Sequence, residues 1–340
     1  SGSRDRSDAS AELGDVGREP RWATARKFAP DMAVTRLERA RQAFFRRVKA
    51  GQKPGYPRFK PKDRYRSFTF KDCKTKKHWL VAGGKRLSLY GIGNVKIKLH
   101  RPMEGTLTQV RVMLDSDGHW YANLVCRDVP RKVLPGTGQH VGVDVGITTF
   151  AALSTGEDVE SPRPYRAAQR HLRTAQRRVS RRKRGSKRRR KAIGLLAKQH
   201  GKVARIRCDF HHKAASDLVV QFDSIAVEDL HIQGLARGML AKHVHDAGWA
   251  QFISILEAKA ESAGREILKV DPRGPSQECS LCGASAPKTL AERTHVCPEC
   301  GVLMGRDHNA AVVIYRRGQR LRGGLSDGWP WEPRSPFLAR

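Results

Sequence analysis

The chain has 340 residues, enough for two or three domains with cores of their own. It carries 66 lysine and arginine residues against 33 aspartate and glutamate residues, a formal net charge of +33, and a compact domain with that imbalance repels itself unless a polyanion is present. No apolar run approaches the roughly 20 residues that a membrane-spanning helix needs, and no signal peptide is visible. We therefore expect a cytoplasmic, reducing compartment, with no membrane partner.

The first predicted helix covers residues 31–49, where apolar side chains recur at three- and four-residue steps after Pro30 and Asp31. Residues 1–20 precede it as a tail to which we assign no structure. Between residues 67 and 126 the pattern changes to six short alternating segments, with a hairpin turn at residues 115–118. These segments predict a small antiparallel barrel or sandwich, followed by a linker at residues 128–140.

The second half of the chain predicts a mixed α/β architecture. Residues 141–148 favour a buried strand that turns into a second strand at residues 149–156. We then expect mostly helix over residues 163–221, a strand at 222–229, a helix from about 246 to 263 and a strand at 266–270. A short helix is expected to begin near Asp307, and the last twenty residues are expected to be irregular.

Three carboxylates lie in or beside apolar segments or just after a cysteine cluster: Asp144, Glu228 and Asp307. A carboxylate in an apolar strand needs a partner, because its desolvation is costly. Two of them have a simpler interpretation alone: Asp144 could cap a turn at the end of the strand, and Asp307 could be a helix N-cap. Strand alternation also allows only one of Glu228 and Asp229 to share a site with Asp144, and the pattern itself does not choose between them.

As a set, the three carboxylates predict metal-dependent cleavage of phosphodiesters. That chemistry uses several carboxylates around two Mg²⁺ ions about 4 Å apart, where one ion activates water and the other stabilises the leaving oxygen. Mg²⁺ prefers oxygen ligands of this kind. The order of strand aspartate, strand glutamate and helix aspartate can bring three such side chains together on one mixed sheet.

Four cysteines form two C-x-x-C pairs separated by fourteen residues: Cys279, Cys282, Cys297 and Cys300. The spacing predicts a tetrahedral zinc site on two tight turns, and four thiolates leave no open position, so the zinc would be structural. A pair of disulfides is the alternative, which the reducing compartment and the spacing disfavour. We interpret the scattered Cys73, Cys126 and Cys208 as small buried or half-buried side chains.

Residues 163–191 contain 15 lysine or arginine residues, and no acidic residue occurs from 161 to 208. An apolar stripe runs through this segment at helical spacing: Tyr165, Ala168, Leu172, Ala175 and Val179. One face therefore packs, and the remaining cationic surface favours phosphate contacts without sequence specificity. The candidate nucleic-acid-binding residues are Arg173, Arg177, Arg178, Arg181, Arg182, Lys183, Arg184, Lys187, Arg188, Arg189 and Arg190.

Together these segments resemble the TnpB family, the RNA-guided nucleases of bacterial insertion sequences, which are often labelled transposases and are related to miniature type V CRISPR effectors. GVDVGITTFAALSTG resembles the first RuvC motif of the family, VEDLHIQGL the second, and the cysteine segment running into GRDHNAAVVI the third. Residues 29–51 and 55–70 resemble a recognition helix and the start of a wedge barrel, and residues 246–267 resemble the helix before the last RuvC strand. The resemblance selects Glu228 over Asp229.

The resemblance implies an RNase H-like RuvC nuclease with an inserted zinc finger. In such proteins a guide RNA, transcribed from the end of the element, pairs with target double-stranded DNA, while the protein recognises a short flanking motif. The implied cofactors are one structural Zn²⁺, two catalytic Mg²⁺ ions and the guide RNA, and the implied catalytic residues are Asp144, Glu228 and Asp307.

The expected domain organisation follows from the same resemblance. It comprises a tail (1–20), a partial helical recognition module (21–62), a wedge-like β-barrel (63–134), the RuvC domain (135–271) with a basic helical insertion (163–208), a zinc finger (272–304), the final RuvC segment (305–320) and an irregular tail (321–340).

Two departures from the family pattern bear on targeting. The chain begins after the strand and several helices with which the family usually opens, and Gly274-Pro275 stands where relatives often have an aromatic residue. We therefore keep two other hypotheses: a non-cleaving RNA- or DNA-binding relic or repressor of the same family, and a cut-and-paste transposase. The order of the three acids and the resemblance speak against the transposase.

Overall fold

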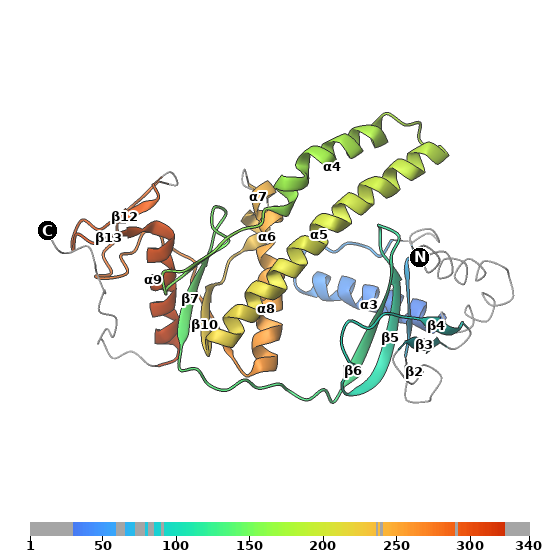
Figure 1. Cartoon of the computed structure of the whole chain (residues 1–340), viewed down its shortest axis with the longest axis horizontal. Helices are drawn as coiled ribbons and strands as arrows, with labels where there is room; N and C mark the ends of the chain where they lie inside the picture. The colour runs from blue at the N-terminus through green and yellow to red at the C-terminus, as the bar shows by residue number, and fades with distance from the viewer. Residues whose placement is uncertain are drawn as a thin grey trace, which may run out of the picture. The chain divides into compact units, whose positions relative to one another are not determined.

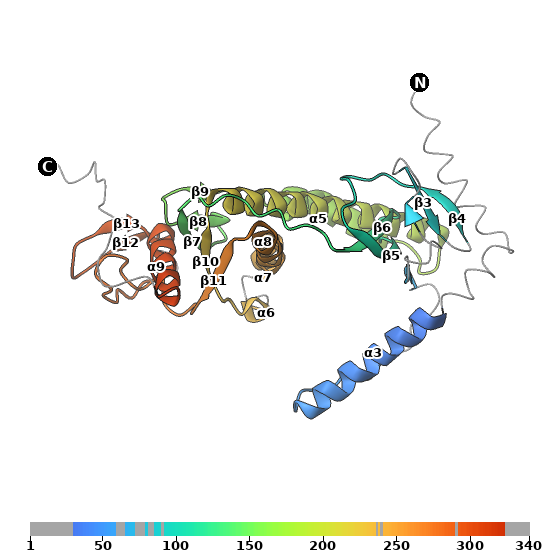
Figure 2. The same cartoon turned by 90° about the horizontal axis from the view of Figure 1, so that it is seen from below.

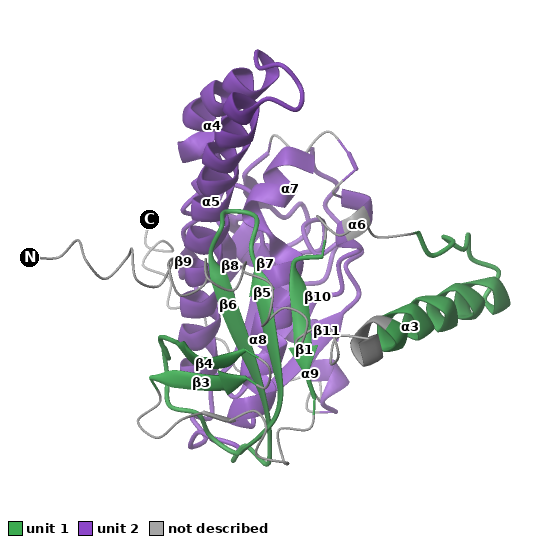
Figure 3. Ribbon diagram, turned by 90° about the vertical axis from the view of Figure 1, so that its right-hand side faces the viewer, with its two compact units in different colours: residues 1–130 green, residues 131–340 purple. Residues whose placement is uncertain are grey.

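The computed structural model of the chain (Figure 1) describes residues 30–58, 65–71, 79–80, 85–89, 92–235, 237–238, 241–289 and 292–323. The expected tail at residues 1–20, most of the expected tail at 321–340, and Cys73 lie outside these residues. The chain divides into two compact units, residues 1–130 and 131–340, which are green and purple in Figure 3.

Unit 1 contains the first predicted helix and the predicted short strands. The elements are α3 (Pro30–Lys49), β1 (Ser67–Phe70), β2 (Trp79–Leu80), β3 (Arg86–Leu89), β4 (Gly93–Lys96), β5 (Thr106–Leu114) and β6 (Trp120–Arg127). The hairpin turn predicted at residues 115–118 joins β5 and β6, and Gly118 there has a φ of 90°.

The described strands of unit 1 form two antiparallel sheets of three strands, in the orders β1-β5-β6 and β2-β3-β4. A closed barrel is therefore not confirmed. Both sheets contribute to one small core, which contains Phe70, Leu87, Leu89, Leu107 and Val110. Packing two short sheets on a shared apolar layer gives the alternating side chains of each strand one buried face.

Unit 2 is built on a five-stranded mixed sheet in the order β11-β10-β7-β8-β9. Its strands are β7 (His140–Val145), β8 (Ala151–Leu153), β9 (Asp158–Val159), β10 (Ser224–Glu228) and β11 (Glu266–Val270). β10 lies between β7 and β11 and runs parallel to both, whereas β8 and β9 are antiparallel to their neighbours. The predicted pair of buried strands around Asp144 is confirmed as β7 and β8.

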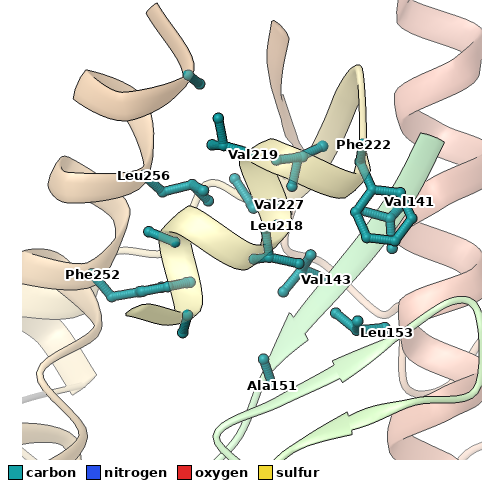
Figure 4. Packing of buried hydrophobic residues seen from close by; sticks show 14 of the residues in the cluster. Val141, Val143, Ala151, Leu153, Leu218, Val219, Phe222, Val227, Phe252 and Leu256 are labelled. Carbon is teal, nitrogen blue, oxygen red and sulfur yellow. The ribbon is translucent and has the colours of Figure 1, made fainter. Parts of the chain in front are cut away.

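Helices cover both faces of this sheet. On one face lie α5 (Lys187–Gln221) and α8 (Trp249–Ala263), and on the other lies α9 (Arg306–Leu321), as Figures 1 and 2 show. The main core fills the α5 and α8 side, where Val143 of β7 and Val227 of β10 meet Leu218, Phe252 and their neighbours (Figure 4). Because side chains alternate along a strand, the residues directly before and after each of these valines point to the other face, toward α9.

Two helix boundaries differ from those expected. The helix predicted over about 246–263 is α8 (Trp249–Ala263), whose start lies slightly later than expected because its N-cap, Gly248, has a left-handed φ of 68°. The residues before Gly248 belong to a separate helix, α7 (Ala241–Ala247). The helix predicted as short near Asp307 is the 16-residue α9. The remaining elements of unit 2 are α6 (Ile232–Leu235), β12 (Thr294–Val296) and β13 (Leu303–Gly305).

The basic segment forms a helical hairpin of α4 (Pro164–Ser180) and α5, which run side by side (Figures 1 and 2). The predicted apolar stripe is confirmed: Leu172 and Val179 are buried, and Tyr165, Ala168 and Ala175 are half-buried. Asp246 of α7 fixes the start of α4, because its carboxylate accepts hydrogen bonds from the backbone N–H groups of Tyr165 (2.8 Å) and Arg166 (3.1 Å).

Candidate metal centres

Asp144 and Glu228 lie side by side on the α9 face of the sheet. β7 and β10 are parallel, with Gly142 opposite Ala226, so the residues two positions further along are Asp144 and Glu228. Ala226 and a Cβ built on Gly142 both contact α9 residues, and alternation puts the two acids on that same face. Asp229 comes after the end of β10 and is exposed.

α9 approaches this part of the sheet so closely that glycine is required. A Cβ at Gly142 would lie 2.1 Å from the carbonyl oxygen of Ala311 and 2.4 Å from the backbone nitrogen of Tyr315. One strand along, a Cβ at Gly318 of α9 would lie 2.5 Å from the Cβ of Ala226. Small residues on both elements therefore let the backbone of α9 rest directly on β7 and β10.

Asp307 lies in the first turn of α9, but it is not the N-cap. The N-cap is Gly305, and no side chain caps the helix there, so the N-cap interpretation of Asp307 is wrong. Its carboxylate instead accepts hydrogen bonds from Nε and Nη2 of Arg306, both at 3.0 Å. Arg293, just before β12, lies 3.9 Å away on its other oxygen.

The three carboxylates act on one another electrostatically. Burial, and then the charge of Asp307, raise the pKa of Asp144 to about 7, although Arg306 opposes the shift. Burial, and then the charge of Asp144, raise the pKa of Glu228 to about 8, although Arg317 opposes it. Clustered acids with raised pKa values are typical of functional sites, where burial and like charges are arranged close together.

The donor set fits a hard divalent cation. Among the described residues, neither the carboxylate of Asp144 nor that of Glu228 has a hydrogen-bond or ion-pair partner, and carboxylate oxygens are the ligands that Mg²⁺ prefers. The three acids do not, however, form a group of converged ligand atoms among those residues, since the Asp307 carboxylate is turned to Arg306. The predicted magnesium set therefore stays a prediction.

The four cysteines do converge. Cys279, Cys282, Cys297 and Cys300 place their sulfur atoms within 4.8 Å of one another, the one such group of three or more candidate ligands in the described part of the chain. The distance between the sulfurs is 3.7 Å for Cys279 and Cys300 and 3.5 Å for Cys282 and Cys297. Four thiols at such distances match the tetrahedral zinc site that the spacing predicts.

Two matching turns bring the cysteines together. Gly283 donates its N–H to the carbonyl of Cys279, and Gly301 donates to the carbonyl of Cys297, each at 3.0 Å. Both glycines have left-handed φ values, 79° and 71°, which a residue with a side chain rarely adopts. Backbone N–H groups, chiefly that of Cys300, hold the pKa of Cys297 at about 6, and metal binding needs the thiolate.

Side chains that the sequence patterns did not single out connect the cysteine turns to α9. Asn309 is fully buried and bonds backbone groups on both sides of Cys279. Arg317 donates to a carboxylate oxygen of Glu278 at 2.6 Å and to the carbonyl of Asp271 at 2.7 Å. The sequence pattern nearest to these residues is the NAA run after Asp307, and it predicts a helix but not these contacts.

Most of the basic candidates lie on the exposed surface of the α4–α5 hairpin and at its tip. Arg189 is the exception: it is half-buried, and its Nη1 donates to the carbonyls of Val179 (2.8 Å) and Arg182 (3.1 Å). Ser186 caps α5 by accepting the N–H of Arg189 at 3.1 Å. Arg189 therefore closes the tip of the hairpin, and the other predicted contact residues remain available to a ligand.

Two family models match the chain. The model described as "Probable transposase" (OrfB_IS605) matches residues 124–239, and the Cas12f1-like TNB domain matches residues 249–314. Asp144 and Glu228 lie in the first match, and the four cysteines and Asp307 lie in the second.

Curated relatives carry names of the same kind. The chain is 34% identical over 227 residues to the "Putative RNA-guided DNA endonuclease" of Streptomyces pristinaespiralis. The matched region covers 65% of this chain and 56% of that relative. It is 26% identical over 302 residues to the "Putative RNA-guided DNA endonuclease InsQ" of Escherichia coli K12, which covers 84% of this chain and 73% of that relative. The chain thus spans little more than half the length of the first relative.

Among solved structures, the cryo-EM structure of a Cas12f1–sgRNA–target DNA complex contains a chain that overlaps with a TM-score of 0.48 and 15% identity, covering 73% of this chain and 59% of that one. Within the described residues, no helix is both long and apolar enough to cross a membrane.

Proposed function

Since the chain belongs to the TnpB family, we propose that it is a transposon-associated, RNA-guided DNA endonuclease. The observation that carries the proposal is the pairing of Asp144 with Glu228 on one face of a mixed sheet, under the helix that carries Asp307 in its first turn. We further propose that this sheet is the RNase H-like core of a RuvC-type nuclease. The remaining expected modules, including a wedge made of the two sheets of unit 1, are part of the same proposal.

Asp144, Glu228 and Asp307 are the proposed ligands of two Mg²⁺ ions, which when bound would activate water and stabilise the leaving oxygen. The parallel pairing of β7 and β10 holds the first two carboxylates in register, and α9 presents the third. Burial keeps Asp144 and Glu228 protonated to about pH 7 and 8 without a cation, so both must release their protons when they bind metal. Arg306, which donates hydrogen bonds to the Asp307 carboxylate, must also release that carboxylate or share it with the metal.

The cysteine cluster is proposed to hold a structural Zn²⁺, because its four thiols leave no position for substrate. The α4–α5 hairpin is proposed to contact the phosphates of guide RNA or target DNA, because its exposed lysine and arginine side chains are not balanced by any acidic residue from 161 to 208. Base pairing with the guide would then select the sequence, while the protein binds the shape of the duplex.

The test compares two substitutions of the same chemical kind, one at a proposed ligand and one at an exposed carboxylate. Asp144→Asn keeps the size of the side chain but removes a proposed ligand, so cleavage of target DNA by the purified RNA complex with Mg²⁺ should fall by a factor on the order of a thousand or more. RNA binding should be nearly unchanged. Asp229→Asn is the control, because Asp229 lies beyond β10 and is exposed. A fully active Asp144→Asn variant would refute the proposal.

The same assay separates the remaining alternatives. Guide-dependent binding of target DNA without nicking, in the unsubstituted protein, would favour the non-cleaving hypothesis. Joining of element ends to a target would favour the transposase.

A further inference from the structure

Asn309 joins α9 to the first cysteine turn through both ends of its side-chain amide. Its Oδ1 accepts the backbone N–H of Ser280 at 2.9 Å, and its Nδ2 donates to the carbonyl oxygen of Glu278 at 2.7 Å. The side chain is completely buried, as is Cys279, which lies between these two backbone groups. An asparagine amide has one acceptor end and one donor end, so this geometry uses both and fixes the orientation of the amide.

Asn309 is also two residues after Asp307, in the first turns of α9. Arg316, two turns further along the helix, donates to the carbonyl of Ser280 at 2.7 Å. At the start of the helix, Arg306 bonds Asp307 with one part of its guanidinium and donates to the carbonyl of Glu292 at 3.0 Å with another. The helix that carries Asp307 is therefore attached to the cysteine segment on both sides of that residue.

We propose that Asn309 is a positioning residue that couples the cysteine cluster to Asp307, so that metal held by the four thiolates orders the carboxylate site. The proposal rests on the function proposed above. The backbone that Asn309 binds is the backbone that carries Cys279, and a metal site of this kind orders its turns only when the metal is bound. Partners beyond the ligands themselves commonly set ligand orientation, and their loss typically costs about 10- to 100-fold in metal affinity.

If the cysteine cluster acts on α9 through Asn309, the effects of removing zinc and of removing the Asn309 amide should not add. Amide hydrogen exchange in α9 can measure both effects. In the unsubstituted protein, stripping zinc should speed the exchange of the amides of residues 310–313 by at least about tenfold, because the turn that binds Asn309 loosens. In Asn309→Ala these amides should already exchange fast in the zinc-loaded form, and stripping zinc should change them little. Slow exchange in zinc-loaded Asn309→Ala, or an equal effect of zinc in both proteins, would overturn the proposal.

Two controls separate coupling from general loss of stability. Ile314→Val removes a buried methylene from the other side of α9, where Ile314 packs on Ala226 and Val270, and it should leave the effect of zinc intact. Ser280→Ala removes only a hydroxyl that contacts Met304 and keeps the N–H that Asn309 accepts. Should Asn309→Ala fail to fold, Asn309→Ser supplies the same comparison, because serine is too short to bridge both backbone groups.

A second measurement addresses the carboxylates without using cleavage. Mn²⁺ binding, titrated by electron paramagnetic resonance on zinc-loaded protein, should weaken by about 10- to 100-fold in Asn309→Ala and should be lost from the site in Asp144→Asn. If Asp144→Asn binds Mn²⁺ normally, the proposed function fails while the exchange result still decides the attachment of α9 to the cysteine turn. If only Asn309→Ala binds normally, the coupling proposal fails and the nuclease assignment stands.

Discussion

Asp144 and Glu228 hold their protons at pH values at which free carboxyl groups are ionised. Burial accounts for most of this effect, and the neighbouring acids add to it, so their pKa values rise to about 7 and about 8. Between about pH 4 and pH 8 the folded protein therefore binds protons that the unfolded chain has already released. Because the folded state holds the extra protons, the free energy of unfolding must fall as the pH rises through this range.

We expect magnesium-free, zinc-loaded protein to lose on the order of 6 kcal/mol of stability between pH 5 and pH 8.5 through these two groups together. Urea unfolding at both pH values measures the loss, and Asp144→Asn should flatten the profile because amide nitrogen does not titrate. Added Mg²⁺ should raise the stability at pH 8.5 by stabilising the ionised carboxylates. An equally steep profile in Asp144→Asn would contradict this account.

Individual residues differ in how much of their role the sequence predicts. The four cysteines are predictable because turn geometry fixes the spacing of zinc ligands within a short segment. Strand alternation alone left the choice between Glu228 and Asp229 open, and the resemblance selected Glu228. In the structure, Val227 packs in the core under α5 and α8, which puts Glu228 on the α9 face. The partners of Asp307 and Asn309 depend on how α9 packs against a segment up to 31 residues earlier, which no local pattern specifies.

At the scale of the elements, the position of Asp307 relative to Asp144 depends on the close contact of α9 with β7. Gly142→Ala should be destabilising by on the order of 3 kcal/mol, because its Cβ would overlap backbone atoms of α9 and the helix would have to move. That movement should also reduce cleavage. Thermal unfolding and the cleavage assay measure the two effects.

The matched control for that substitution is Gly194→Ala in α5, where an added Cβ meets no atom within 4 Å. Removing a glycine from a helix interior should raise stability by up to about 1 kcal/mol. If both substitutions had the same effect, the tight packing of α9 on the sheet would not be what positions Asp307.

Local periodicity predicts the long helices and most strands, but not every helix boundary or the pairing of the strands. Long amphipathic helices such as α3, α4 and α5 carry many residues of one period, and most strands were placed within a few residues. The break at Gly248 was missed because the apolar spacing continues across it, and a single glycine is compatible with a helix. The arrangement of the strands of unit 1 into two sheets depends on non-local pairing, which alternation alone does not define.

At the scale of the whole molecule, much of the positive charge lies where no acidic residue balances it, in residues 161–208 of the α4–α5 hairpin. If these cations contact phosphates, binding releases counterions, and affinity for nucleic acid should fall on the order of a thousandfold between 50 and 200 mM salt for about six or more contacts. The exposed tip offers a direct test. Replacing Arg181, Arg182, Lys183 and Arg184 with alanine should weaken binding of unrelated sequences alike.

The salt dependence of binding shows whether the alanine variant has lost phosphate contacts. For each phosphate that the alanine variant no longer neutralises, the slope of log affinity against log salt should become shallower by roughly 0.7 to 0.9, so a tip that binds several phosphates must change the slope and not merely the affinity. Lysine at the three arginine positions keeps the charge and should preserve the slope, since the counterion effect depends on charge and not on the shape of the guanidinium. Arg189 must stay in both variants, because it closes the hairpin by bonding the carbonyls of Val179 and Arg182. Equal slopes for the alanine and lysine variants would mean that the tip faces solvent in the complex, and the phosphate contacts would then have to come from the rest of the hairpin or from unit 1.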